Sequence, residues 1–286
     1  MMQRLDHTRI ACLGSKFAPQ SIMADRRGRL YLSMPQNETI IKDRLEDGGR
    51  RIPDLRIYHV TSDQPELIAS VRGLWAGRIG DNDVESVEKI TALLENGVAG
   101  NPYFVYAITD GEANVISAVN VIPWKEIGTL QCVLLATDER MENKGYGTLA
   151  AMAGLSGAWA TLGPHDRARY VFGELEPVMK NFEIFGKMTG GNLRIADATY
   201  TLPPLEEGRQ PTSLMAGLIV IDPHESDEQM HKSDYARLVN YVHENFYGTL
   251  DYAKRMLLTV PSRIQLLNPM EMAAEGLQTL MEKLTR

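Results

Sequence analysis

Hydrophobic and polar positions between residues 57 and 222 follow the two periods that distinguish strands from helices. Short apolar runs predict strands at residues 57–61, 103–109, 115–122, 130–136, 170–176, 193–202 and 214–221. Apolar residues at every third or fourth position predict helices at residues 63–75, 83–97, 147–162 and 179–188. The predicted order is therefore β-α-α-β-β-β-α-β-α-β-β, with an aspartate-glycine turn at residues 110–111 between the second and third strands.

The pattern is weaker on both sides of this region. Residues 29–34 read as a short strand and residues 39–45 as a short helix, among basic clusters. Amphipathic helices, whose apolar faces need a surface to pack on, are predicted at residues 234–247, 251–259 and 269–284. That surface is the core, a second subunit in a homodimer, or a substrate site that the helices cover as a lid. We therefore predict an N-terminal extension (1–56), a core (57–222) and a helical C-terminal extension (223–286).

Composition narrows the class of protein. The chain has 286 residues, of which 44% are hydrophobic and 23% charged, as in a globular protein with a sizeable core. No apolar run approaches the ~18 residues of a membrane span, and the N-terminus lacks the apolar segment of a secretory signal. The net charge of −7 argues against general nucleic-acid binding. The two cysteines lie too far apart to indicate a disulfide or metal framework, so we expect a cytoplasmic protein with no membrane or nucleic-acid partner.

A glycine-containing loop joins the strand at 130–136 to the helix that follows it. Gly145 and Gly147 allow a tight turn, and the N–H groups and dipole of the next helix favour an anion, most often a phosphate. A P-loop needs a lysine after its second glycine, but here Lys144 precedes the first glycine of the pair. A dinucleotide fingerprint needs a third glycine where Ala150 stands. What remains is Glu-Asn-Lys-Gly-Tyr-Gly at residues 142–147.

This loop resembles the acetyl-CoA pyrophosphate loop of the GNAT (Gcn5-related) N-acetyltransferases, Gln/Arg-x-x-Gly-x-Gly/Ala. The order of elements from residue 56 to residue 222 is also similar to the GNAT core, element for element. The departure is Glu142, which puts a carboxylate near a pyrophosphate unless its side chain turns away. The resemblance implies an α/β (α+β) fold, with a mixed, mostly antiparallel central sheet flanked by helices, an N-terminal arm and a C-terminal helical extension.

The resemblance also implies a binding site for acetyl-CoA as co-substrate, without a metal. In this family the pantetheine arm lies between the fourth and fifth strands, and a polar residue at the start of the following helix contacts it. The residues implied along the arm are Leu135, Ala136, Thr137 and Asn181. The residues implied around the pyrophosphate are Glu142, Asn143, Lys144, Gly145, Tyr146, Gly147 and Thr148.

Acetyl transfer to an amine needs a base for the ammonium and a proton for the leaving thiolate. Alternation along the fifth strand places Glu174 and Glu176 on one face, where one could accept a proton through water and the other could hold the substrate's charge. The alternative is that both face solvent at the strand end. Many GNAT enzymes use a tyrosine in the next helix as proton donor, but Phe185 stands at the matching position. Solvent, Tyr106 or Tyr200 would then supply the proton.

The sequence thus predicts direct transfer of acetyl from acetyl-CoA to a primary amine of a small metabolite or peptide. The alternatives are a CoA-binding sensor or scaffold without turnover, and transfer of a longer acyl group. The histidines show no metal-ligand spacing and no serine lies in a nucleophile elbow, so metal catalysis and serine hydrolysis are not favoured.

Overall fold

The computed structural model describes residues 23–24, 30–31, 38–41, 46–47, 50–51, 55–110, 114–162, 169–189, 191–202, 212–221, 228–269, 271–272 and 274–284. The chain divides into two compact units. The N-terminal unit comprises Leu32–Pro123 and Leu130–Gly163, and the C-terminal unit comprises Met1–Tyr31, Trp124–Thr129 and Pro164–Arg286. This division does not test the predicted boundaries at residues 56 and 222, which stay a prediction.

The N-terminal unit is built on a sheet with the strand order β9-β8-β7-β6-β3. The pairs β3–β6, β6–β7 and β7–β8 are antiparallel. The strands of the sheet are β3 (Glu38–Ile41), β6 (Leu55–Val60), β7 (Phe104–Thr109), β8 (Val115–Trp124) and β9 (Thr129–Thr137). The helices are α1 (Pro65–Arg78), α2 (Val87–Asn96) and α3 (Tyr146–Ala160), and a separate hairpin pairs β4 (Glu46–Asp47) with β5 (Arg50–Arg51).

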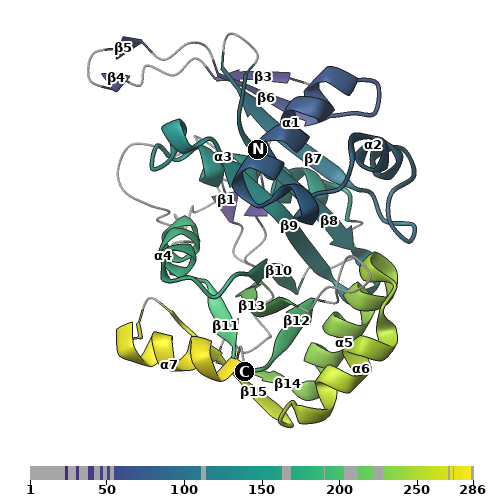
Figure 1. Cartoon of the computed structure of the whole chain (residues 1–286), viewed down its shortest axis with the longest axis vertical. Coiled ribbons are helices and arrows are strands. Elements are labelled where there is room, and N and C mark those ends of the chain that lie inside the picture. Colours follow the sequence, from purple (N-terminus) through teal and green to yellow (C-terminus); the bar gives the residue numbers. More distant parts are fainter. Residues whose placement is uncertain are drawn as a thin grey trace, which may run out of the picture. The chain divides into compact units, whose positions relative to one another are not determined.

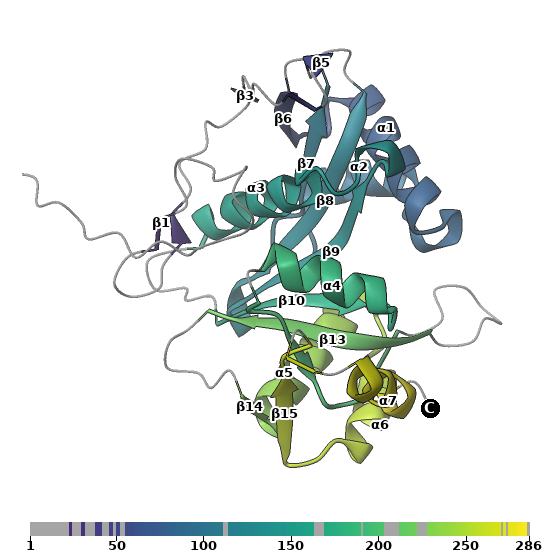
Figure 2. The same ribbon diagram turned by 90° about the vertical axis from the view of Figure 1, so that its left-hand side faces the viewer.

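Helices cover both faces of this sheet, with α1 and α2 on one face and α3 on the other (Figure 2). On the α1 face, the indole of the fully buried Trp75 donates a hydrogen bond to the carbonyl of Ala118 at 3.3 Å. On the α3 face, a Cβ added to Gly154 would lie 2.7 Å from a methyl carbon of Val119 and 2.9 Å from one of Val121. Glycine at this position therefore lets α3 approach β8 closely.

Most predicted elements of this unit are confirmed, and two differ. The second helix begins at Val87, because Ser86 accepts a hydrogen bond from the Lys89 N–H and caps it there; residues 81–83 form a separate 3₁₀ turn. The predicted helix at residues 39–45 is wrong over its described part, because residues 39–41 belong to β3. That run is threonine and two isoleucines, whose β-branched side chains favour a strand. Residues 42–45 lie outside the described residues.

The C-terminal unit contains a second set of paired strands, in the order β14-β15-β11-β13-β10, with β12 also paired to β13. The strands are β10 (Tyr170–Leu175), β11 (Arg194–Ala196), β12 (Tyr200–Leu202), β13 (Thr212–Val220), β14 (Gln229–His231) and β15 (Arg263–Leu267). A further hairpin pairs β1 (Met23–Ala24) with β2 (Leu30–Tyr31). The predicted strand at 193–202 is therefore two short strands, both paired to β13.

The two faces of these strands are covered by different helices. Leu175 and Met215, directly opposite each other in β10 and β13, pack with residues of α4 (Met179–Met188) and α7 (Ala274–Leu284) in one apolar cluster. Phe172, an odd number of residues from Leu175, faces the other way and meets the ring of Tyr200 edge-on. The side chains on that second face therefore include Glu174, two residues after Phe172.

The C-terminal extension is part of this unit and contributes strands as well as helices to it (Figure 1). Its helical elements are α5 (Lys232–Val242), a π-helical turn (His243–Tyr247), α6 (Leu250–Met256) and α7. The apolar face of α5 is buried, with Tyr235, Val239 and Val242 fully inaccessible. Strand β15 pairs with both β11 and β14, so "helical" describes only part of the extension.

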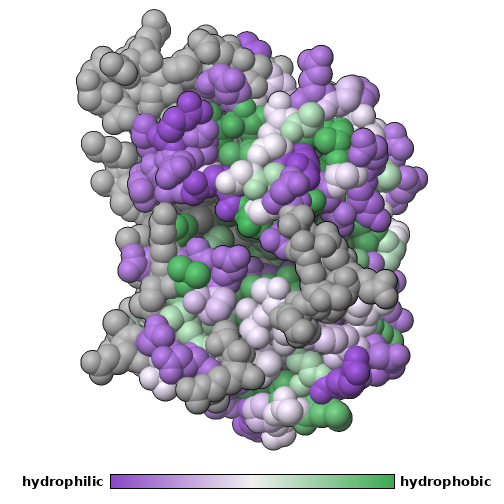
Figure 3. Space-filling model, viewed as in Figure 1, coloured by the Kyte–Doolittle hydropathy of each residue, from purple (hydrophilic) through white to green (hydrophobic). Residues whose placement is uncertain are grey.

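The surface of the described residues shows few large apolar side chains. On the face drawn in Figure 3, hydrophobic residues form small patches among hydrophilic ones. Among the described residues, the exposed large hydrophobic side chains are Val178, Ile184 and Leu258. Within this same part of the chain, no helix is long and apolar enough to cross a bilayer, and no group of three or more potential metal-ligating side chains gathers at one place.

Candidate active site

The loop between β9 and α3 has the geometry that its glycines predict. After a 3₁₀ turn at Glu139–Met141, Asn143 adopts φ +61° and Gly145 adopts φ +86°, both left-handed. Helix α3 begins at Tyr146, and its N-cap, Gly145, has no side chain that could accept a hydrogen bond from the first turn. An anion bound at the N-terminus of this helix would therefore meet backbone N–H groups and the positive end of the helix dipole.

The end of β9 is fixed against both β8 and the loop. The hydroxyl of the buried Ser117 donates a hydrogen bond to the carbonyl of Ala136, and lies 3.0 Å from the hydroxyl of Thr137. A Cβ on Gly147 would lie only 3.0 Å from the Thr137 oxygen, so the helix start and the strand end are in close contact. The structure thus brings together Ala136, Thr137 and the start of α3, and their predicted role in binding CoA stays a prediction.

An arginine neutralises the carboxylate that distinguishes this loop from the usual pattern. Arg78, in the last turn of α1, forms an ion pair with Glu142, and a longer one, 3.6 Å, with Glu139. The side chains of Arg78 and Glu142 are 30% and 23% exposed, so water screens this pair less than a pair on an open surface. The cost expected for a bare carboxylate near a pyrophosphate is therefore reduced by a partner from another element.

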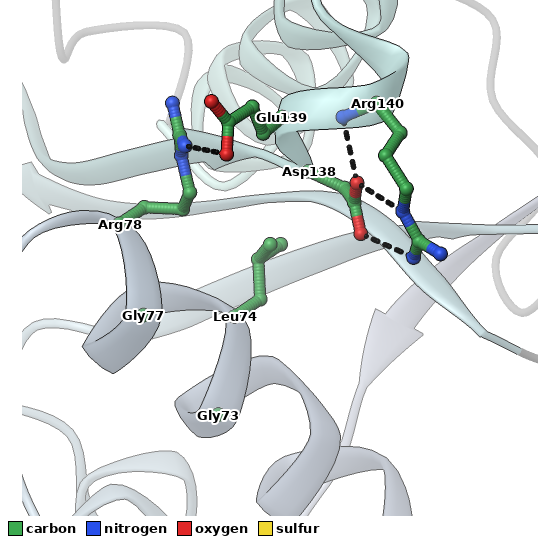
Figure 4. A pocket seen from close by; sticks show the side chains of 7 residues that line it. All are labelled: Gly73, Leu74, Gly77, Arg78, Asp138, Glu139 and Arg140. Atoms are coloured by element: carbon green, nitrogen blue, oxygen red, sulfur yellow. Dashed lines mark hydrogen bonds and ion pairs between the residues drawn. The ribbon is translucent and has the colours of Figure 1, made fainter.

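A pocket lies between α1 and this connection (Figure 4). It has a volume of about 370 Å³ and is lined by Gly73, Leu74, Gly77, Arg78, Asp138, Glu139 and Arg140. Leu74 points into it from α1, while the carboxylate of Asp138 accepts two hydrogen bonds from the Arg140 guanidinium, at 3.0 and 2.8 Å. Those hydrogen bonds lower the pKa of Asp138. The pocket thus has an apolar floor and a rim of paired charges beside the glycine loop.

Tyr106, one of the predicted catalytic residues, lies against α3. Its ring stacks on His59 with centroids 5.0 Å apart, and its hydroxyl occupies the space above Gly157. A Cβ on Gly157 would overlap that oxygen. Burial raises the pKa of Tyr106. A catalytic role for Tyr106 stays a prediction, and the geometry gives its hydroxyl a packing position on the helix.

Glu174, the second predicted catalytic residue, lies in the C-terminal unit and accepts hydrogen bonds on both carboxylate oxygens. Tyr200 donates to Oε1, and Tyr247 donates to Oε2 at 2.6 Å. Burial raises the pKa of Glu174, while these two hydrogen bonds act in the opposite direction. The ring of Tyr200 is fully buried, whereas Glu174 and Tyr247 are half-buried. A carboxylate held in this way can accept a proton from a group that reaches its accessible side.

Glu176 and Asn181 also belong to the C-terminal unit, but they do not share this environment. Glu176 lies just beyond the end of β10 and is exposed. Its backbone carbonyl, rather than its carboxylate, accepts a hydrogen bond from the Asn181 side chain at 3.4 Å. The predicted pair therefore consists of one carboxylate that accepts two hydrogen bonds and one that is exposed at the strand end, and a catalytic role for either stays a prediction.

Two residues at these sites could not be predicted from the sequence. Arg78 is 64 positions from Glu142, and Tyr247 is 73 positions from Glu174. Neither distance corresponds to a helical or strand repeat, so no periodic pattern connects the partners. The one signal in the sequence was indirect, namely that a glutamate within a phosphate-type loop needs a positive partner.

Comparison with solved structures identifies the fold. A protein from Bacteroides thetaiotaomicron described as an acetyltransferase of the GNAT family matches with a TM-score of 0.50 and 16% identity, covering 68% of this chain and 98% of that one. A diaminobutyrate acetyltransferase from Paenibacillus lautus, in complex with L-2,4-diaminobutyric acid and coenzyme A, matches over 61% of this chain and 99% of its own, with 10% identity and a TM-score of 0.43. A spermidine N-acetyltransferase from Vibrio cholerae, in complex with CoA and spermine, matches over 58% and 95%, with 12% identity and a TM-score of 0.42.

No family model and no curated protein sequence matches the chain. The fold is that of an α/β protein with a mostly antiparallel sheet flanked by helices, as the sequence predicts. More particularly, it is the fold of the GNAT acetyltransferases, and the resemblance stated from the loop and the order of elements is confirmed at the level of fold.

Proposed function

We propose that this protein is an acyl-CoA-dependent N-acetyltransferase that transfers acetyl directly from acetyl-CoA to a primary amine. The observation that carries the proposal is the N-terminus of α3, which has Gly145 as its N-cap and follows the loop after β9, on a GNAT fold. The left-handed backbone at Asn143 and Gly145 turns the chain so that the first helical turn can face a pyrophosphate. The pairing of Glu142 with Arg78 supports the proposal, because it offsets the charge that would otherwise repel this ligand.

Among the predicted catalytic residues, Glu174 is the one whose surroundings best suit a base. It would accept, through water, the proton that the substrate ammonium loses before the amine nitrogen attacks the thioester carbonyl. The new C–N bond then forms as the C–S bond breaks. The nitrogen loses a second proton to solvent as the amide forms, and the CoA thiolate leaves and takes one proton from solvent. Among the described residues Glu174 has no ion pair, so its charge favours a cationic acceptor. The net charge of −7 points the same way, towards a small amine metabolite or a peptide amine.

Calorimetric titration with acetyl-CoA and CoA, followed by a thiol-release assay with a panel of primary amines, tests this function. The matched variants are Gly145→Ala in the loop and Gly248→Ala in the C-terminal unit, since both glycines have positive φ, +86° and +67°. Each change costs about 1 kcal/mol of backbone strain. We expect only Gly145→Ala to weaken acetyl-CoA binding, by about tenfold. Absence of binding to the unmodified protein would overturn the proposal.

A second candidate function is that of a CoA-binding sensor or scaffold without turnover. It is favoured by Phe185, which stands where many GNAT enzymes have a proton-donating tyrosine and which packs against the apolar cluster of α4 and α7. A phenylalanine in that cluster can donate no proton. Tight CoA binding without thiol release from any amine of the panel would select this function over the first.

A further inference from the structure

We propose that Tyr247, contributed by the C-terminal extension, is a positioning residue for Glu174, so that the extension completes the base of the transfer reaction. The inference rests on the proposed function, in which Glu174 accepts the proton of the acceptor amine. It concerns a residue 73 positions away in the chain, in the π-helical turn that follows α5.

The geometry of the two hydroxyls fixes the carboxylate. Tyr200, from β12, donates to one oxygen of Glu174 and Tyr247 donates to the other at 2.6 Å. Hydrogen bonds to opposite oxygens prevent the carboxylate from rotating about its last bond, because either rotation would break one of them. With Tyr200 alone, Oε2 would lose this anchor.

Tyr247 is itself held in place by a buried histidine. The ring of His243, which is fully inaccessible, lies 5.5 Å from the Tyr247 ring and 5.7 Å from the Tyr200 ring. Its Nδ1 lies 3.1 Å from the hydroxyl of Thr249, and the Thr249 N–H donates to the His243 carbonyl at 2.8 Å. Tyr252 stacks on the same imidazole. His243 thus sets the spacing between the two tyrosines that hold Glu174.

Hydroxyl groups, rather than a cation, stabilise the charge of Glu174. Among the described residues no basic side chain pairs with it, and the titratable groups around it are Tyr200 and Tyr247, with His243 and Tyr235 beyond them. Burial lowers the pKa of His243 to about 4, so this imidazole is neutral at neutral pH. Burial raises the pKa of Glu174 and the two hydrogen bonds lower it. Removing one donor would therefore favour the protonated carboxyl group and reduce the fraction of active base.

The test compares Tyr247→Phe with Tyr252→Phe in the full chain. Both changes remove one phenolic hydroxyl near His243, but only Tyr247 contacts Glu174. The pKa of Glu174 is read by NMR titration of protein labelled with ¹³C at the glutamate carboxyl carbons, with Glu174→Gln to assign its signal. The acid limb of the pH profile of kcat is measured with one amine and saturating acetyl-CoA, and Tm controls for folding.

We expect Tyr247→Phe to raise the pKa of Glu174 by about one unit or more and to move the acid limb upward by the same amount, with Tyr252→Phe unchanged. A lower Tm with an unmoved pKa would show that Tyr247 only packs, and would overturn the inference. A moved pKa with an unmoved limb would also overturn it, because Glu174 would not be the base. If the unmodified protein binds acetyl-CoA but never releases thiol, the proposed enzyme activity fails, and the NMR titration alone still decides whether Tyr247 holds Glu174.

Discussion

Replacing Arg78 by methionine isolates the electrostatic role of its ion pair with Glu142. Methionine has an unbranched side chain of similar length but no charge, so Glu142 loses its ion pair with Arg78 while its own negative charge stays in the loop proposed to bind pyrophosphate. At a separation of about 7 Å and an effective dielectric of about 40, each pair of unit charges repels by about 1.2 kcal/mol. For a pyrophosphate dianion this amounts to about 2.4 kcal/mol, which weakens the Kd for CoA by about 50-fold.

The chain offers two controls for this experiment. In Arg78→Met/Glu142→Gln the carboxylate is also removed, so we expect the affinity for CoA to return to within about threefold of the original. Arg72→Met replaces another arginine of the same helix, whose ion pair with Asp81, 2.5 Å long, lies outside the loop. This variant should bind CoA as the unmodified protein does. The 50-fold effect should also shrink as salt is added, because screening weakens the repulsion.

Calorimetric titration of CoA into the four proteins gives a clear refutation. If the double variant binds as weakly as Arg78→Met, then Arg78 contributes by touching the ligand or by holding α1, and neutralisation of Glu142 is not its role. If Arg78→Met binds CoA as tightly as the unmodified protein, the carboxylate of Glu142 does not face the bound phosphates, and the proposed site on this loop loses its support.

Further predictions concern the helices and the buried histidine. Gly154→Ala should lower the free energy of unfolding in urea by about 1–3 kcal/mol, because its Cβ would strike Val119. Gly77→Ala in α1, where a Cβ would meet nothing within 4 Å, should raise it by about 0.5–1 kcal/mol. Equal effects of the two changes would contradict the close packing of α3. Burial lowers the pKa of His243 to about 4. Between this pH and the ordinary pKa of histidine, the unfolded chain therefore binds a proton at His243 that the folded chain does not bind. The free energy of unfolding in urea should therefore fall by about 2 kcal/mol from pH 7 to pH 5. The fall should be smaller in His243→Phe, and an equal fall in both proteins would show that other groups cause it.

The sequence was informative wherever the determining contacts are local. The strand, glycine loop and helix around Gly145 follow from a repeat and two glycines within one short stretch, and α4 was predicted with the bounds that it has. Strand β15 carries alternating buried and exposed residues, but it is only five residues long and lies between helical segments, so its period is too short to indicate a strand from the sequence.

The electrostatics of the candidate site could not be read in the same way. The pairing of Arg78 with Glu142, and of Tyr247 with Glu174, depends on how distant segments pack against each other. A single sequence without its fold contains no signal that selects one arginine or one tyrosine among many. The sequence shows that Glu142 places a negative charge in the loop, but only the fold shows that Arg78 pairs with it.

The division of the chain has a consequence for its synthesis. Both segments of the N-terminal unit end by Gly163. The glycine loop, with Glu142 paired to Arg78, can therefore reach its final arrangement while later codons are still being translated. The carboxylate on β10 must wait much longer, since one of its two phenolic partners leaves the ribosome only with the turn at His243–Tyr247. The loop proposed to bind the acyl donor would therefore be complete before the residue proposed as the base has both of its hydrogen-bond donors.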